Sequence, residues 1–371
     1  MRDFFDDAWV VILGSETKII YKSIFKGSEE MKNVLIYLFT FLIICFILPA
    51  ILTKTTTKVE NAQRNSEKQE EEETTNDNVN REKYQYNKYG KIKLLHSKSG
   101  EIEEVELDTY LCNVVSAEMP ADFHIEALKA QAIVARTYTV YKINNKKHPN
   151  ADICDDSNCC QAWIEKAKRL EKWEEGKREE NWNKIETAVN STNGKIITYN
   201  NQPINAFFHS NSGGITELPV NVWGGGNNLP YLQIVETSGE DTYNQFSSEV
   251  SLTNDELLNK LKEKHLDIKI NFEDDEEIKI LEYTDSKRVK TVKFGNINIS
   301  GTETRSTLGL RSTNFEIIKE KDKVIFKVKG YGHGVGMSQT GADSMAKQNK
   351  SYEEIIKHFY AGIEIKSINE L

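Results

Sequence analysis

The residue best suited to acid–base chemistry is Glu118, which lies in the segment Ser116-Ala-Glu-Met-Pro. Proline is tolerated in the first turn of a helix, because its missing N–H would have no partner there. Pro120 therefore predicts that Glu118 stands just before a helix over residues 121–144. A carboxylic acid at such a place can give and take a proton if burial raises its pKa. The alternative is that Glu118 only complements the helix dipole.

The helix expected over residues 121–144 is small and apolar on nearly every side, as in the run Ala-Leu-Lys-Ala-Gln-Ala-Ile-Val-Ala. A helix of this kind is normally buried. Lys129 and Arg136 lie seven residues apart and therefore share one face of it. Because buried charges need partners, we expect both to line a cleft that binds a polar ligand. The alternative is that both are charges at the rim of the core.

A second unusual stretch is Gly330-Tyr-Gly-His-Gly-Val-Gly-Met-Ser-Gln. Its closely spaced glycines let the backbone come very near to a ligand or to another strand. His333 lies among them, and Ser338 and Gln339 are predicted to open a helix whose free N–H groups could face an anion or a sugar oxygen. The alternative is a tight structural crossover with His333 hydrogen-bonded inside.

One imidazole and three thiols come close together in sequence at His148, Cys154, Cys159 and Cys160. Structural zinc sites use Cys and His in sets of four, so this cluster predicts Zn²⁺ that fixes a loop next to the buried helix. The spacing is not that of a standard zinc finger. Disulfides, which would require Cys112 as a fourth partner, and free thiols remain alternatives.

The elements that must hold these residues follow no regular alternation. Alternating or apolar runs predict strands over residues 92–95, 102–107, 194–199, 204–209, 278–294 and 315–329. Periodic or charged runs predict helices over 163–190, 252–262 and 352–360. Because no βαβ rhythm is present, the pattern favours α+β: a single mixed domain of short strands and helices around a central cleft.

The charge of the chain sets limits on its partners. Its 371 residues include 48 Lys and Arg against 57 Asp and Glu, which gives a net charge of −9. This balance does not fit a protein that binds nucleic acid over its whole surface, although a single cleft can still be positive.

Residues 34–52 form an apolar run interrupted by Tyr37, Thr40 and Pro49. As a helix the run would be about 28 Å long, close to the thickness of the hydrocarbon core of a bilayer. No small-x-small cleavage site follows, so we expect a retained transmembrane anchor rather than a cleaved signal peptide. Lysines before the run favour a cytoplasmic N-terminal segment, residues 1–33, and an extracytoplasmic remainder.

Residues 53–90 are rich in Thr, Glu, Asn, Lys and Gln and lack large apolar residues over most of their length. Such a segment cannot bury a core, so we predict a flexible, disordered linker and a folded domain over residues 91–371. Met31 directly precedes the apolar run, and translation starting there is a hypothesis that N-terminal sequencing of the native protein tests.

Several motifs together resemble the stage II sporulation protein D family. They are Ser116-Ala-Glu-Met-Pro, Glu126-Ala-Leu-Lys-Ala-Gln-Ala-Ile-Val-Ala-Arg-Thr-Tyr, Phe208-His-Ser-Asn-Ser-Gly-Gly, Tyr231-Leu-Gln-Ile-Val-Glu, Thr307-Leu-Gly-Leu-Arg-Ser and the glycine-rich stretch from Gly330. The resemblance extends from about residue 92 to the C-terminus and keeps the family's order of motifs.

The resemblance implies a membrane-anchored lytic transglycosylase of endospore engulfment. Such an enzyme lies in the mother-cell membrane, faces the space between the two membranes, and cleaves peptidoglycan strands that have lost their stem peptides, leaving 1,6-anhydro ends. Expected partners are an amidase-endopeptidase, stage II sporulation protein P, and a membrane protein, stage II sporulation protein M. Glu118 is implied as both acid and base. The implied substrate contacts are Lys129, Arg136, Ser210, Tyr231, Tyr331, His333, Ser338 and Gln339.

Two other functions remain open at this stage. The same domain family includes amidase modifiers, which act by binding glycan rather than by cleaving it. An inverting hydrolase with Glu126 or Glu217 as its base is a third possibility, because hydrolysis normally uses two carboxylates. The chain departs from the family at Thr340, where Tyr is frequent, and in its His/Cys loop, which resembles only a subset of the family.

Overall fold

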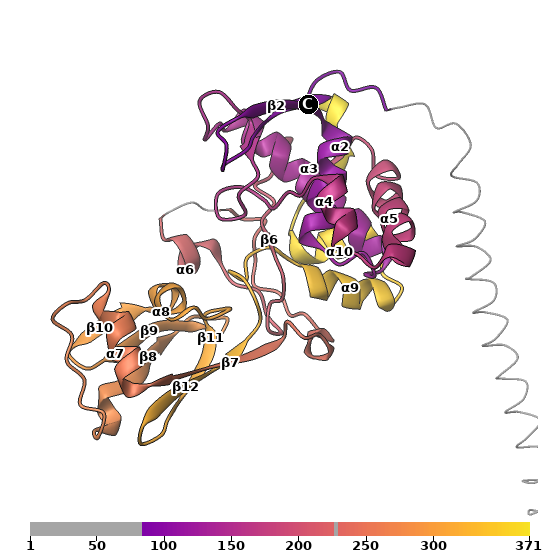
Figure 1. The fold of residues 1–371 in the computed structure, drawn as a ribbon. Helices are drawn as coiled ribbons and strands as arrows, with labels where there is room; N and C mark the ends of the chain where they lie inside the picture. The colour runs from indigo at the N-terminus through magenta and orange to yellow at the C-terminus, as the bar shows by residue number, and fades with distance from the viewer. Residues whose placement is uncertain (1–83, 226–228) are drawn as a thin grey trace, which may run out of the picture. The chain divides into compact units, whose positions relative to one another are not determined.

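The structure is a computed structural model and describes residues 84–225 and 229–371 (Figure 1). The predicted cytoplasmic segment, the transmembrane anchor over residues 34–52 and most of the predicted linker lie outside these residues. Within the described ranges, none of the helices is long and apolar enough to cross a bilayer.

The described chain mixes helices and short strands, as expected for the α+β class, but it builds two hydrophobic cores rather than one. The first core is formed mainly by α2 (Leu107–Glu118), α3 (Ile125–Asn144), α5 (Arg178–Asn190), α9 (Gln339–Lys347) and α10 (Tyr352–Phe359). Figure 1 shows these helices gathered around α3, at a distance from the strands β7 to β12 of the second core.

Helix α3 is the centre of the first core. It packs against α2, α5, α9 and α10, and against strand β4 (Lys195–Tyr199). Its small apolar residues face partners on nearly every side, which is why no single apolar stripe is needed. The helix begins at Ile125, four positions later than predicted, because His124 caps it: the His124 ring accepts a hydrogen bond from the Glu126 N–H at 3.3 Å.

Three small sheets surround this helical core. Strands β1 (Lys91–Leu95), β2 (Ile102–Glu106) and β3 (Ile153–Cys154) pair in the order β2-β1-β3. Strand β4 lies between β14 (Glu364–Ser367) and β5 (Gln202–Pro203). Strand β6 (Phe208–His209) pairs in parallel with β13 (Met337–Ser338), which brings the polar loop after β6 next to the start of α9.

Three tyrosines before β1 already belong to the folded unit. The hydroxyl groups of Tyr84, Tyr86 and Tyr89 contact Ser367, Asp108 and Asn144 at 2.8, 2.6 and 3.0 Å. The packed chain therefore starts before residue 91, the predicted start of the domain. The sequence did not predict this packing, because the three tyrosines lie among polar residues and their partners are 22 or more residues away.

The second core lies under two antiparallel sheets, β11-β12-β7 and β10-β9-β8. Their strands are β7 (Ser247–Thr253), β8 (Ile278–Tyr283), β9 (Val289–Phe294), β10 (Ile297–Ser300), β11 (Asn314–Lys319) and β12 (Lys323–Lys329). Helices α7 (Asn254–Lys262) and α8 (Gly301–Leu308) cover the strands. Helix α7 confirms the helix predicted over residues 252–262 but starts two residues later, at Asn254, where Thr253 and Glu256 form a capping box.

The glycine-rich stretch joins β12 to β13 and packs closely against the chain itself. Gly336 has φ +73°, and a Cβ there would lie 2.0 Å from the carbonyl oxygen of Phe207. Gly332 has φ +114° and would place a Cβ 2.9 Å from the Cβ of His209. Only glycine fits these positions. The glycines therefore let the backbone approach the segment of residues 207–209, as in the structural crossover considered from the sequence.

Candidate active site

Glu118 is the last residue of α2, and six residues separate it from Ile125, so the expectation that it stands directly before the first turn of the buried helix is wrong. Met119 is extended, with φ −120° and ψ 144°, because the residue before a proline is disfavoured in helical conformation. Pro120 lies in the loop between α2 and α3 rather than in a first helical turn. The helix that positions Glu118 is therefore α2, which the sequence pattern did not distinguish from the strand before it.

Glu118 lines an open cleft of about 810 Å³. One wall is the end of α2 with the loop after it, and a second is formed by α4 (Lys166–Glu171), the segment after it and the start of α5. Ser210, Gln339 and Thr340 close the cleft on a third side. Of the predicted substrate contacts, Ser210 and Gln339 thus share a cleft with Glu118.

The carboxyl group of Glu118 is partly buried and has two hydrogen-bond donors. The N–H of Ala162 donates to Oε1 at 2.6 Å, and the Gln339 amide donates to Oε2 at 3.4 Å. Burial raises the pKa of Glu118 from 4.5 to about 7, and the two hydrogen bonds only partly offset this effect. The group can therefore hold a proton near neutral pH and also release it, as acid–base chemistry requires.

A buried carboxylate, Glu240, fixes the side of the cleft formed by Ser210 and α9. It accepts hydrogen bonds from Ser212, Thr340 and Ser338, and from the N–H of Gly214 at 2.9 Å. Ser338 caps α9, and the Thr340 N–H donates to the Ser210 carbonyl at 3.1 Å. Sequence reasoning missed Glu240, because most of the groups that donate to it lie more than twenty residues away in the sequence.

Two of the predicted contacts on α3 do not reach the cleft. Arg136 is fully buried, and its guanidinium donates to the carbonyls of Thr192, Val189 and Lys195 at 2.9, 3.2 and 3.2 Å. It also lies 3.7 Å from Asp108. The prediction that Arg136 lines a binding cleft is therefore corrected: the arginine joins α3 to the loop before β4.

Lys129 pairs with Glu126 on its own helix, with 2.9 Å between Nζ and Oε1. The other oxygen of Glu126 accepts the N–H of Tyr352 at 2.7 Å. Glu126 and Lys129 are both absent from the residues that line the cleft of Glu118. Glu126 is thus engaged in holding α10 against α3, rather than being free to activate a water molecule.

Glu217, the other candidate base, is buried. Its carboxylate accepts hydrogen bonds from Thr284 and Ser286 at 2.6 Å each, and from Asn221 at 2.8 Å. These partners tie the first core to β8 and the turn after it. Neither candidate base lines the cleft of Glu118.

The remaining predicted contacts lie apart from the cleft. The Tyr231 ring is buried and its hydroxyl accepts the Asn205 N–H at 3.1 Å. Tyr331 is 45% exposed and carries Arg311 over its ring. His333 packs against Trp223, with ring centres 5.1 Å apart, and burial lowers its pKa well below the usual value. Ser338 is buried as the cap of α9.

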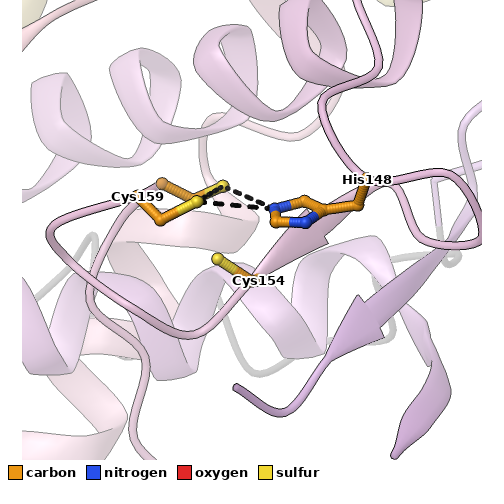
Figure 2. Close-up of side chains that lie close together, drawn as sticks. His148, Cys154 and Cys159 are labelled. Carbon is orange, nitrogen blue, oxygen red and sulfur yellow. Dashed lines mark hydrogen bonds between the residues drawn. The ribbon is translucent and has the colours of Figure 1, made fainter. Parts of the chain in front are cut away.

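The structure brings His148, Cys154, Cys159 and Cys160 together, with all four ligand atoms within 4.8 Å of one another. Figure 2 shows the side chains pointing toward a common centre, with His148 opposite the sulfur atoms. The Cys159 and Cys160 sulfurs each lie 3.6 Å from Nε2 of His148 and 3.9 Å from each other. All four described cysteines, including Cys112, are free thiols.

These distances fit a tetrahedral zinc site. With Zn–S bonds of about 2.3 Å and a Zn–N bond of about 2.0 Å, a tetrahedron places sulfur and nitrogen about 3.5 Å apart and two sulfurs about 3.8 Å apart. The observed separations of 3.6 and 3.9 Å are close to both values. The cluster therefore has donor types that could hold a metal ion, and three of its four ligand atoms, those of His148, Cys159 and Cys160, have the spacing of a tetrahedral zinc site.

The cluster is connected to Glu118 by a short piece of chain. Cys160 is followed by Gln161, whose buried amide donates to the hydroxyls of Tyr110 and Thr139 at 2.9 and 3.0 Å. The next residue is Ala162, whose N–H contacts the Glu118 carboxylate. Fixing the cysteine loop thus fixes a hydrogen-bond donor to the acid of the cleft.

The sequence of the chain is similar to those of known sporulation proteins. A family model described as "Stage II sporulation protein" matches residues 95–199. The chain is 36% identical over 268 residues to stage II sporulation protein D of Bacillus subtilis (strain 168), covering 71% of this chain and 75% of that protein. Identity is 35% over 267 residues to the protein of the same name from Bacillus amyloliquefaciens, with coverages of 71% and 75%.

A further relative carries a different name. The chain is 28% identical over 306 residues to a Bacillus subtilis protein named amidase enhancer, covering 69% of this chain and 40% of that protein. The family model and the two Bacillus proteins define a class of sporulation proteins. Within that class, the chain belongs to the stage II sporulation protein D family, as the motifs around Glu118 and after Gly330 indicated.

Proposed function

We propose that this protein is a lytic transglycosylase that cleaves peptidoglycan strands devoid of stem peptides and leaves 1,6-anhydro ends. The observation that carries the proposal is Glu118, a carboxyl group in an open polar cleft whose pKa burial raises to about 7. One such group suffices for a reaction in which an acid step and a base step follow each other.

In the first step, protonated Glu118 gives its proton to the glycosidic oxygen, and the bond from that oxygen to the anomeric carbon breaks. In the second step, ionised Glu118 takes the proton from the sugar's own 6-hydroxyl group, whose oxygen bonds to the anomeric carbon. The carboxyl group is then protonated again, and no water molecule is consumed. The hydrogen bonds from Ala162 and Gln339 support the ionised form between the two steps.

The involvement of other carboxylates is less well supported. Hydrolysis by inversion would need a base across the scissile bond from Glu118. Glu126 and Glu217 are held by hydrogen bonds elsewhere. The cleft itself also holds Asp122, Glu174 and Glu180, of which Glu180 pairs with Lys177 at 2.8 Å, and this interaction lowers the pKa of Glu180.

The second candidate function is that of a non-catalytic enhancer, and the relative named amidase enhancer favours it. In this case the cleft would bind glycan and present it to a partner amidase. The partners we propose in either case are a stage II sporulation protein P-like amidase-endopeptidase and a stage II sporulation protein M-like membrane protein, with no nucleic acid.

Product analysis separates the two functions. Denuded glycan strands are incubated with the full-length protein, with Glu118→Gln and with Glu126→Gln as a matched control, and the ends are identified by mass. The proposal expects anhydro ends from the wild type and from Glu126→Gln, and none from Glu118→Gln. Binding of strands without any new ends in all three proteins would support the enhancer instead.

We also propose that the four-residue cluster holds a structural Zn²⁺ ion bound by His148, Cys154, Cys159 and Cys160. The fit of the distances to a tetrahedron supports this assignment. The bound ion would fix the loop in front of α4 and the hydrogen bond from Ala162 to Glu118. Elemental analysis of metal-replete protein tests it: about one zinc per chain is expected, and its absence would leave the cluster as thiols.

The cellular placement that we propose follows the apolar run at residues 34–52. A single membrane anchor would keep residues 1–33 in the mother-cell cytoplasm and hold the folded domain in the space between the two membranes at the septum. Protease added to the outside of protoplasts should digest the folded domain and spare an N-terminal tag. Protection of the folded domain under these conditions would count against this topology.

A further inference from the structure

One wall of the cleft carries an arginine without a counter-charge. Arg169, in the last turn of α4, lines the cleft together with Glu118. Its guanidinium lies over the ring of Trp173, with 4.9 Å from Cζ to the ring centre. The buried Nε atom has no hydrogen-bond partner. Within residues 84–225 and 229–371 no carboxylate forms an ion pair with it.

The energetics of this arginine favour an incoming anion. Burial alone lowers the pKa of Arg169, and no acidic neighbour counters that effect. A half-buried cation without a partner is unfavourable, and it gains when an acceptor of opposite charge approaches. Stacking on Trp173, which packs against the first core, holds the guanidinium in place before any ligand binds.

A second cation extends the same wall. Lys172 is exposed at the end of α4 and lines the cleft, and among the described residues it forms no ion pair. In contrast, Lys168 on the same helix lines a different pocket and pairs with Glu165 at 3.1 Å. Arg169 and Lys172, which form no ion pair among the described residues, therefore line the cleft of Glu118, whereas the paired Lys168 does not.

We propose that Arg169, on the platform of Trp173 and assisted by Lys172, is a specificity-determining residue that binds the free carboxylate of a glycan strand. The inference rests on the proposed function. In peptidoglycan the only carboxylate of the sugar backbone is that of the lactyl ether group on every second sugar. It is free once the stem peptide has been removed, and it is an amide while the peptide is attached.

This arrangement gives the cleft a reason to prefer denuded strands. A guanidinium forms paired, charge-assisted hydrogen bonds with a carboxylate, whereas a neutral amide offers a single acceptor and no charge. Trp173 also lines the cleft, so the part of its indole ring that the guanidinium leaves open can contact the adjacent sugar ring. The same wall would discriminate against a neutral chain of N-acetylglucosamine alone.

Binding is measured in a Glu118→Gln background, so that strands stay intact. The probes are denuded glycan strands, the same strands with their lactyl carboxylates converted to methylamides, and chitin oligomers of similar length. Arg169→Gln and Lys172→Gln are compared with Lys168→Gln, which removes the same charge from the same helix. Circular dichroism and thermal unfolding confirm that each variant is folded.

Denuded strands should bind the parent about tenfold or more tightly than they bind Arg169→Gln, and several times more tightly than Lys172→Gln. Methylamidated strands and chitin should bind parent and variants equally, and Lys168→Gln should match the parent. Arg169→Lys should recover part of the loss. Added salt should weaken binding of denuded strands to the parent more than to Arg169→Gln.

The proposal is overturned if Arg169→Gln weakens all three probes equally, because the arginine would then act through structure alone. It is also overturned if the parent binds methylamidated strands as tightly as free ones. If Arg169→Gln does not fold, the proposal is tested by two other measurements: the binding of denuded strands to Lys172→Gln, and the affinity of the parent for free compared with methylamidated strands. Failure of the proposed function is visible separately, as the absence of anhydro ends from the wild type despite carboxylate-dependent binding.

Discussion

Replacing Glu118 by glutamine tests the burial of this carboxyl group through the stability of the protein. Burial raises the pKa of Glu118 from 4.5 to about 7. One pKa unit corresponds to about 1.4 kcal/mol, so the folded protein favours the protonated over the ionised carboxyl by about 3 kcal/mol more than the unfolded chain does.

The sign follows from proton linkage. Because the pKa is higher in the folded state, the folded protein binds this proton more tightly than the unfolded chain does. The contribution to stability is fully present below pH 4.5, declines as the pH rises, and is lost by about pH 7. The amide of Glu118→Gln does not ionise, so the variant should lack this decline.

We expect Glu118→Gln and wild type to differ by less than about 1 kcal/mol near pH 4, and the variant to be up to about 3 kcal/mol more stable near pH 8.5. Urea unfolding at several pH values measures the difference. Glu171→Gln, at an exposed position at the end of α4, is the matched control and should show no such trend. A constant difference across the pH range would refute the reasoning.

Other substitutions are expected to act in different ways. Cleavage by the wild type should fall about tenfold per pH unit above pH 7, as the acid form of Glu118 disappears, and a flat profile would speak against that role. Arg136→Gln should lower the free energy of unfolding by about 3 kcal/mol or more, because buried carbonyls lose their donor. A variant that is as stable as the wild type but binds glycan more weakly would instead indicate that Arg136 contacts the substrate. Cys154→Ser should abolish zinc binding and lower the melting temperature, and an unchanged zinc content would exclude the site. Gly336→Ala should cost about 2 kcal/mol or more by urea unfolding, because its Cβ would meet the Phe207 carbonyl, whereas wild-type stability would argue against that contact.

The sequence was most informative where chemistry depends on neighbouring residues. The four candidate ligands of the His/Cys loop lie within one short segment, so their spacing indicated the cluster that the structure shows. The family's motifs indicated Ser210 and Gln339 as substrate contacts, and both residues line the cleft of Glu118. Helix α7 was predictable from its capping residues and its apolar period alone.

Features that depend on distant partners were not predictable in this way. Arg136 looked like a cleft residue because an arginine in an apolar helix needs partners, but those partners are carbonyls of a turn more than fifty residues away. Glu240 and Arg169 had no distinguishing neighbours in the sequence. The division into two cores was not predicted either, because it depends on which strands pair, and the residues of the second core are spread from Leu252 to Val328.

The most direct test of the central claim, that Glu118 serves in turn as acid and base, is cleavage of denuded strands in water enriched in heavy oxygen. In transglycosylation the oxygen that bonds to the anomeric carbon comes from the sugar's own 6-hydroxyl group and not from water. The account therefore predicts anhydro ends without label from the wild type and no new ends from Glu118→Gln. Labelled reducing ends, or cleavage by the variant at the wild-type rate, would contradict it.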